Sequence, residues 1–297
     1  FIDHGHKAIL LVGGATGMIG DPDGKKQERE LQSVETIAQN KAALAKQYET
    51  IFAGKSFEIV DNYDWFKTIN YLDFLRDVGK HASMTQMLDR DFIKSRIGEG
   101  GEGISYAEFS YSLIQGYDFL HLFREKGVTL QLAGADQWGN SITGVQLIRR
   151  LESKEAHVFT TPLVVNKATG VKFGKSEAGA VWLDPQKTSP YKFYQFWINA
   201  DDADLPKFMR YFTLRSKEEV EALEREHADN PRELKRLLAE ELTIRVHSQE
   251  AFESVLKVSE LLFGKNADQA ALLAMSREEL ATVSEEIPTF SLNQESL

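Results

Sequence analysis

Short apolar runs alternate with helical segments through the first 165 residues of this chain, and this alternation constrains the fold more than any other feature. The runs that predict strands are residues 7–13, 56–62, 128–133 and 159–165. The segments with helical spacing are residues 33–53, 65–78, 105–125 and about 137–152. Such alternation predicts a parallel sheet with helices on both faces. Ligands of these sheets bind beyond the carboxyl ends of the strands, so we expect the site after Val12 and Leu132.

The sequence changes character at Ser189. From there it is rich in Leu, Glu, Lys, Arg and Ala with helical periodicity, and Pro206, Pro231 and Pro288 divide it. The fold class predicted is therefore α/β, followed by an all-α domain. The chain has no cysteine, no run near the roughly 18 apolar residues that cross a bilayer, and no secretory start. We expect a cytoplasmic protein that makes no contact with a membrane.

The net charge bears on the class of partner. Against 35 Lys and Arg stand 45 Asp and Glu, which gives −10. This balance argues against a protein that coats nucleic acid through many phosphate contacts. A local patch for one RNA remains compatible with it, and Arg232, Lys235 and Arg236 are candidates on one predicted helix. We favour a solvated helix face as the explanation of these three residues.

A glycine-rich segment, residues 13–25 (GGATGMIGDPDGK), follows the first predicted strand. Its glycines allow the backbone to approach a ligand. The spacing fits neither the dinucleotide fingerprint nor the P-loop. Asp21 is the residue of interest, because an acid at a strand end can bind a ligand's ammonium group. A tight turn with a solvated acid is the competing interpretation.

Three polar residues of the segment 108–118 (EFSYSLIQGYD) share one face of the predicted long helix. Tyr111, Gln115 and Asp118 are spaced i, i+4 and i+7, within roughly 60° of one another around the helix axis. A polar group among apolar neighbours is typical of a small-molecule pocket. The alternative is an amphipathic helix with its polar face in solvent, although Lys and Glu are more typical of such a face.

Two further segments carry candidate residues. In residues 132–140 (LAGADQWGN), Gly134 permits close approach, and Asp136 and Gln137 offer acceptors to a ribose or an amino acid. Asp136 as a helix N-cap is the structural alternative. In residues 171–177 (VKFGKSE), Lys172, Lys175 and Ser176 suit a flexible clamp on a polyphosphate, which stabilises developing negative charge.

Together these four segments closely resemble the bacterial-type tyrosyl-tRNA synthetases, a family of class I aminoacyl-tRNA synthetases. The motifs VGGATGMIGDPDGK, EFSYSLIQGYDF, LAGADQWGN and KFGKS stand in the family's order. The resemblance covers nearly all of residues 6–200 and is looser beyond. It implies a Rossmann-like catalytic domain over 1–162 with a dimer-forming insertion at about 65–103. It also implies a loop and linker at 163–188, and an α-helical anticodon-stem and tRNA-binding domain over 189–297.

The resemblance also implies a role for each candidate residue. Asp118 would accept a hydrogen bond from the tyrosine phenol. The residues implied around the amino group and the bound amino acid are Tyr111, Gln115, Asp21, Thr16 and Gln137. On the ATP side, Gly134 and Asp136 would contact the adenylate. The implied phosphate and pyrophosphate residues are Lys172, Lys175 and Ser176 of the KMSKS-type loop, with Lys25 and Arg29. Asn62 is a weaker candidate.

The activity implied is that of a tyrosine–tRNA ligase, which activates L-tyrosine with ATP and transfers it to tRNA(Tyr). A homodimer is implied, with Mg²⁺ arriving on ATP and no dedicated metal site. The family's N-terminal His-Ile-Gly-His-type segment and its C-terminal S4-like domain have no counterpart here, and His4-Gly-His6 is not that motif. The missing N-terminal segment therefore leaves open a catalytically impaired, synthetase-derived RNA-binding protein. An NAD-dependent oxidoreductase using the glycine-rich segment is a further alternative, which the failed fingerprint spacing disfavours.

Overall fold

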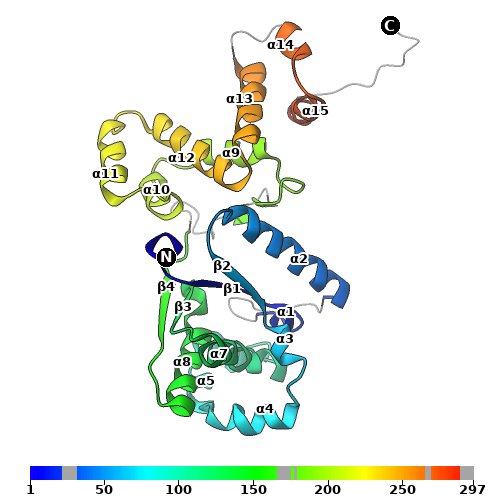
Figure 1. Cartoon of the computed structure of the whole chain (residues 1–297), viewed down its shortest axis with the longest axis vertical. Coiled ribbons are helices and arrows are strands. Elements are labelled where there is room, and N and C mark those ends of the chain that lie inside the picture. Colours follow the sequence, from blue (N-terminus) through cyan, green and yellow to red (C-terminus); the bar gives the residue numbers. More distant parts are fainter. Residues whose placement is uncertain (22–31, 166–174, 177–178, 265–268, 288–297) are drawn as a thin grey trace, which may run out of the picture. The chain divides into compact units, whose positions relative to one another are not determined.

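The computed structural model describes residues 1–21, 32–165, 175–176, 179–264 and 269–287 (Figure 1). These residues divide into two compact units, Phe1–Val164 and Val165–Leu297. The first unit contains the paired parallel strands and the second is mainly helical. Each unit is described separately below.

The first unit alternates strands and helices along the chain. Its strands are β1 Ala8–Val12, β2 Phe57–Asp61, β3 Leu130–Gly134 and β4 His157–Thr161. Its longer helices are α2 Val34–Ile51, α7 Tyr106–Lys126 and α8 Trp138–Glu152. Its shorter helices are η1 Ile2–His4, α1 Gly14–Gly17, α3 Tyr63–Phe66, α4 Tyr71–Asp77, η2 Gly79–His81, α5 Met84–Leu88, α6 Asp91–Ile97 and η3 Ala135–Gln137. The predicted α/β alternation is confirmed in these elements.

The four strands form two parallel pairs. Strand β1 pairs with β2 in the register Ala8 to Phe57, and β3 pairs with β4 in the register Leu130 to His157. Within the described residues the two pairs are separate sheets, where the sequence predicted one. The fourth strand also begins and ends earlier than the predicted 159–165. Because the strands are parallel, the ends of β1 and β2 lie side by side, as do those of β3 and β4.

The prediction of one continuous helix over residues 65–78 is wrong. Residues 65–78 form two short helices, α3 and α4, in place of a single one. The break occurs because Asn70 adopts an extended conformation and its side chain accepts a hydrogen bond from the Leu72 N–H, which caps a new helix. The long helix α7 begins as expected, at a capping box formed by Ser105 and Glu108.

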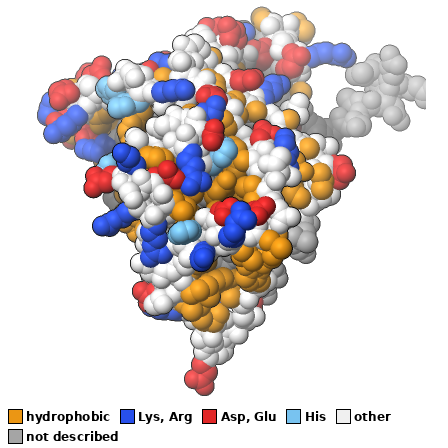
Figure 2. Space-filling view, turned by 60° about the horizontal axis from the view of Figure 1, so that its bottom comes forward, with side chains coloured by type: hydrophobic (Ala, Val, Ile, Leu, Met, Phe, Trp, Pro, Cys, Tyr) orange, Lys and Arg blue, Asp and Glu red, His pale blue; other side chains and the backbone are white. Residues whose placement is uncertain are grey.

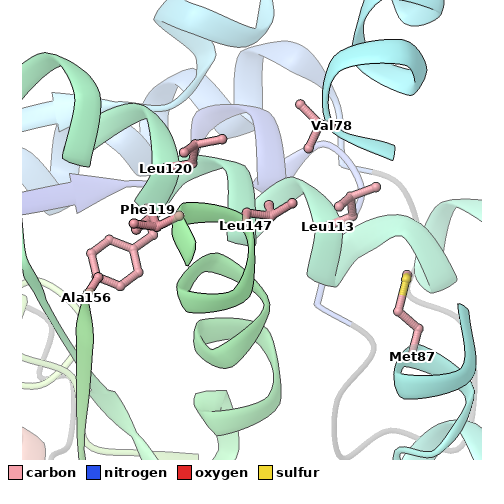
Figure 3. Packing of buried hydrophobic residues seen from close by; sticks show 8 residues of the cluster. Val78, Met87, Leu113, Phe119, Leu120, Leu147 and Ala156 are labelled. Atoms are coloured by element: carbon pink, nitrogen blue, oxygen red, sulfur yellow. The ribbon is translucent and has the colours of Figure 1, made fainter. Parts of the chain in front are cut away.

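The core of the first unit lies between α7 and α8. Leu113, Phe119 and Leu120 of α7 pack with Leu147 and other buried residues that Figure 3 shows from close by. The helices approach closely because each carries a glycine at the crossing. A Cβ on Gly116 would lie 2.8 Å from Thr143 Cγ2, and one on Gly144 would lie 2.8 Å from Phe119 Cβ. This contact fixes α7, the helix that carries three candidate residues.

The regular elements described between Ser189 and Ile287 are all helices, which confirms the predicted change of character. They are α9 Pro190–Ile198, α10 Leu205–Phe212, α11 Lys217–Glu226, α12 Pro231–Val246, α13 Gln249–Phe263, α14 Gln269–Leu273 and α15 Arg277–Glu286. Trp197 packs at the centre, with its ring centroid 5.0 Å from that of Phe212. Before these helices, β5 Lys175–Ser176 pairs antiparallel with β6 Gly179–Ala180.

Candidate functional site

Asp118 is a buried carboxylate held by two hydrogen-bond donors. Its side chain on α7 is 2% exposed. Asn62 Nδ2 donates to Oδ2 over 3.1 Å, and the indole Nε1 of Trp65 donates to Oδ1 over 2.9 Å. Both donors come from the segment that follows β2, more than 50 residues earlier in the chain. The predicted solvent-facing alternative for this helix is therefore wrong at Asp118, whose carboxylate points into the protein.

Burial sets the acidity of this group. Desolvation raises the pKa of the Asp118 carboxyl to about 7, against the hydrogen bonds from Asn62 and Trp65, which lower it. Repulsion from Asp61 adds to the rise. A buried acid that titrates near neutrality, with both oxygens oriented, is a typical mark of a binding or catalytic site.

Asn62 joins this carboxylate to the glycine-rich segment. Its side chain is fully buried, its Oδ1 accepts a hydrogen bond from the Ala15 N–H over 2.7 Å, and its Nδ2 also donates to Thr16 Oγ1 over 3.1 Å. The neighbouring Asp61 accepts from the Gly14 N–H over 3.1 Å. A Cβ on Gly14 would lie 2.3 Å from Asp61 Oδ1, so only glycine fits there. The ends of β1 and β2 thus hold the segment in place.

A second polar group joins Gln115, Gln137 and Asp21. Gln115 Nε2 donates to Gln137 Oε1 over 3.1 Å, and Gln137 Nε2 donates to Asp21 Oδ2 over 2.8 Å. These three residues come from α7, from the end of β3 and from the glycine-rich segment. The structure therefore brings together residues that the sequence separates by up to 116 positions. Tyr111, one turn before Gln115 on α7, is also buried.

The remaining candidates have mixed outcomes. Gly134 ends β3, and Asp136 lies partly exposed in η3. Asp136 is not the N-cap of α8: that position is Gln137, and its side chain makes no capping hydrogen bond. Lys172, Lys25 and Arg29 lie outside the described residues, as do the side chains of Lys175 and Ser176, whose backbone is in β5.

Of the three basic candidates on α12, Lys235 and Arg236 are paired with acids, whereas Arg232 is exposed. Lys235 pairs with Asp202, and Arg236 pairs with Glu233 at 2.6 Å and with Glu240 at 2.9 Å. These acids neutralise the two side chains, so the interpretation as a solvated, internally paired face is the better one.

Sequence reasoning gave too little weight to three residues. Asn62 was a weak candidate, whereas the structure gives its side chain three hydrogen bonds, to Ala15, Thr16 and Asp118, in addition to the bond from its backbone N–H to Val12. Trp65 and Arg90 were missed. Asn62 had one local signal, an amide directly after a buried strand. Trp65 and Arg90 had none, because their partners lie about 50 residues away.

Comparisons with known proteins identify the family of this chain. The family model for tRNA synthetases class I (W and Y) matches residues 1–264. Tyrosine–tRNA ligase of Bacteroides thetaiotaomicron is 47% identical over 99% of this chain and 70% of its own length. The ligase of Cytophaga hutchinsonii is 48% identical over 98% of this chain and 68% of its own length. The C-terminally truncated mitochondrial tyrosyl-tRNA synthetase of Aspergillus nidulans superposes with a TM-score of 0.76 at 28% identity, covering 88% and 78% of the two chains.

With a family match over most of its length, and with polar clusters at the strand ends, the chain is a class I aminoacyl-tRNA synthetase with a Rossmann-like catalytic fold. The relatives specify the amino acid, because they are tyrosine–tRNA ligases. The chain belongs to the tyrosine–tRNA ligases, EC 6.1.1.1. The family match gives no support to the NAD-dependent alternative.

Proposed function

We propose that the two polar clusters are the two ends of the L-tyrosine site. Asp118 accepts the hydrogen bond of the phenol, Tyr111, Gln115 and Asp21 bind the α-ammonium group, and Thr16 and Gln137 lie beside the bound amino acid. The observation that carries this proposal is the buried Asp118 carboxylate, oriented by Asn62 and Trp65. A buried acceptor of this kind strengthens the binding of a ligand that has a hydroxyl group. When the hydroxyl is absent, the buried carboxylate lacks that partner and binding is weaker.

The proposed reaction depends on how the site positions tyrosine and ATP relative to each other. The tyrosine carboxylate attacks the α-phosphorus of ATP, the bond to the β,γ-phosphates breaks, and pyrophosphate leaves. The 3′-terminal ribose hydroxyl of tRNA(Tyr) then attacks the carbonyl of tyrosyl-adenylate, and AMP leaves. No side chain needs to form a covalent intermediate, so orientation and charge stabilisation supply the rate.

We assign the ATP side to residues at and beyond the end of β3. Gly134 lets the backbone approach the adenylate, and Asp136 faces the ribose. Lys172, Lys175 and Ser176, with Lys25 and Arg29, neutralise the phosphates. Across the described residues no group of three His, Asp or Glu side chains could hold a metal ion. We propose that Mg²⁺ arrives as part of the ATP substrate.

We also propose that the chain pairs with a second copy through the segment of about 65–103 and the start of α7. Several apolar side chains there are exposed: Tyr71 60%, Leu72 70%, Met84 58%, Ile97 51% and Tyr106 63%. Figure 2 brings the end of the molecule with α4 and α5 forward and shows a patch of hydrophobic side chains. Tyr71 and Tyr106 are joined by a 3.4 Å hydrogen bond between their hydroxyls. Sedimentation of the chain and of a Leu72→Asp, Tyr106→Asp variant tests this pairing.

The remaining assignments concern tRNA and location. We propose that residues 189–297 bind the tRNA and that the enzyme acts in the cytoplasm. No helix in the described part of the chain is long and apolar enough to span a membrane.

The test of the proposed function is tyrosine-dependent ATP–pyrophosphate exchange, together with direct tyrosine binding by calorimetry. Phenylalanine and tryptophan are the control ligands, and Asp118→Asn and Asp64→Asn are the matched variants. Asp64 is an exposed acid paired with Lys67 near the same segment. We expect tyrosine alone to bind, Asp118→Asn to lose this preference and Asp64→Asn to keep it. Folded protein that binds tRNA but neither binds nor activates tyrosine would instead favour a retired RNA-binding relative.

A further inference from the structure

Arg90 contacts the second polar cluster from outside the strand ends. It lies at the N-cap of α6, and its guanidinium reaches the start of α8. Nη1 donates to Asn140 Oδ1 over 3.0 Å, and Nη2 donates to Gly139 O over 2.5 Å and to Thr143 Oγ1 over 2.6 Å. The guanidinium packs beside Gly139, where a Cβ would lie 3.4 Å from Arg90 Cζ, an ordinary van der Waals distance.

The hydrogen bonds continue from Arg90 to the proposed ammonium site through two amides. Asn140 is 5% exposed, and its Nδ2 donates to Gln137 Oε1 over 3.2 Å. Gln137 Oε1 also accepts from Gln115 Nε2, and Gln137 Nε2 donates to Asp21. We call the series Arg90, Asn140, Gln137, Gln115 and Asp21 the amide relay.

The two ends of the amide relay decide which way its amides point. A guanidinium has five N–H donors and no acceptor, whereas a carboxylate only accepts. Asn140 must therefore turn its oxygen to Arg90 and its NH₂ to Gln137. Gln137 must in turn present its oxygen to Asn140 and its NH₂ to Asp21. Either amide alone could be rotated by 180° at little cost in shape, so the charged ends, not packing, select the direction.

This direction determines what Gln115 offers to a ligand. Its NH₂ is committed to Gln137, and no hydrogen bond within the described residues ends on its Oε1. The free oxygen is an acceptor, which suits an ammonium group. If the relay ran the other way, the oxygen of Gln115 would be committed and its NH₂ would face the cation, which is unfavourable.

We propose that Arg90 is a positioning residue that, together with Asp21 at the other end, sets the direction of the amide relay and thereby makes Gln115 an acceptor for the substrate's ammonium group. The proposal rests on the proposed tyrosine site. It also gives the segment of about 65–103 a second role, because that segment supplies Arg90 to the amino-acid site.

Binding of two ligands separates positioning from general damage. L-Tyrosine carries the ammonium group, and 3-(4-hydroxyphenyl)propionate has the same phenol and carboxylate without it. In Arg90→Gln the end group can donate or accept, so Asn140 is no longer held in one orientation and Asp21 alone fixes Gln137. We expect tyrosine to bind about tenfold more weakly, as for loss of one hydrogen bond to a charged group, and the propionate to be nearly unaffected. Arg90→Lys, which only donates, should restore most of the affinity.

The control variant is Arg124→Gln, which removes an arginine paired with Glu152 on the outer faces of α7 and α8. It should leave the affinity of both ligands unchanged. The proposal is overturned if Arg90→Gln weakens both ligands equally, if Arg90→Lys is as weak as Arg90→Gln, or if Arg124→Gln reproduces the effect.

A measurement without ligand tests the relay itself. The side-chain NH₂ of Gln137 is observed by NMR in ¹⁵N-glutamine-labelled protein and identified by its loss in Gln137→Leu. We expect Arg90→Gln to shift this signal and to speed its hydrogen exchange, and Arg90→Lys to preserve it. An unchanged Gln137 signal in Arg90→Gln overturns the relay. A changed signal in a protein that fails to bind tyrosine supports the relay and refutes the tyrosine site instead.

Discussion

Preference for tyrosine over phenylalanine should strengthen as the pH rises, because Asp118 ionises near neutrality. Burial raises the pKa of its carboxyl to about 7. Each oxygen already accepts one hydrogen bond, from Asn62 or from Trp65. The phenol proton needs a further lone pair, and a hydrogen bond to an ionised oxygen is the stronger one. Phenylalanine brings no such proton and gains nothing from ionisation.

The pKa of Asp118 sets how strongly the preference for tyrosine changes with pH. A carboxyl of this pKa is about one-tenth ionised at pH 6 and about nine-tenths ionised at pH 8. If tyrosine requires the ionised form, the ratio of its affinity to that of phenylalanine should rise about tenfold between these two pH values. Calorimetric titration of both amino acids into the wild-type chain and into Asp118→Asn measures this ratio. A ratio that stays flat with pH in the wild type, or that rises equally in Asp118→Asn, would refute the reasoning.

The ligand-free chain gives an independent check on the same pKa. Because the folded-state pKa lies above the ordinary value of 3.8, the contribution of Asp118 to stability is complete below about pH 3.8 and is lost as the pH rises through 7. The upper limit of this loss is on the order of 4 kcal/mol, from a shift of about three units. Urea unfolding should therefore show wild type losing stability relative to Asp118→Asn over this range.

Three further outcomes are expected, each from denaturant unfolding. Asn62→Leu should cost about 2–4 kcal/mol, because it leaves the Ala15 N–H without its acceptor and Asp118 Oδ2 without its donor, although Trp65 still donates to Oδ1; a cost below 1 kcal/mol would contradict the hydrogen bonds described. Gly116→Ala should lower stability by about 1–2 kcal/mol despite alanine's helix propensity, since the new Cβ meets Thr143 Cγ2 at 2.8 Å and the Gly144 backbone N at 3.0 Å, whereas Gly17→Ala, whose Cβ meets only Ile37 Cγ2 at an ordinary 3.8 Å, should not. Burial lowers the pKa of His247 below 6.5, so stability should fall as the pH drops through 6.5; His247→Phe should lose this dependence, and an unchanged slope would exclude His247 as its source.

Local patterns in the sequence predicted the elements that depend on local chemistry. The apolar runs became β1 to β4, and the long helix begins at the Ser105 capping box. The break between α3 and α4 was also local, since Asn70 is a typical cap residue, but an uninterrupted apolar spacing hid it. The prediction of Asp136 as a helix cap was wrong because a 3₁₀ turn, η3, precedes α8. The N-cap of α8 is therefore Gln137, one residue later.

The candidate site divides in the same way. Tyr111, Gln115 and Asp118 could be grouped because helix periodicity alone places them on one face. Asn62, Trp65 and Arg90 could not, since their importance depends on partners about 50 residues away in the chain. Only the pairing of β1 with β2 and the packing of α7 on α8 bring those partners within hydrogen-bonding distance.

The contacts of Trp65 make its fluorescence sensitive to the state of the proposed tyrosine site. Its indole N–H is bonded to Asp118, and its ring stacks on His121 with centroids 4.4 Å apart. The chain has four tryptophans, and this one touches the proposed phenol acceptor directly. When the Asp118 carboxyl group loses its proton, or when a phenol binds to it, the charge beside the Trp65 indole N–H changes. Burial lowers the pKa of His121, so the stacked imidazole stays neutral at neutral pH and does not quench as a cation would. The fluorescence of Trp65 therefore offers an unlabelled signal of whether the tyrosine site is empty, protonated or filled.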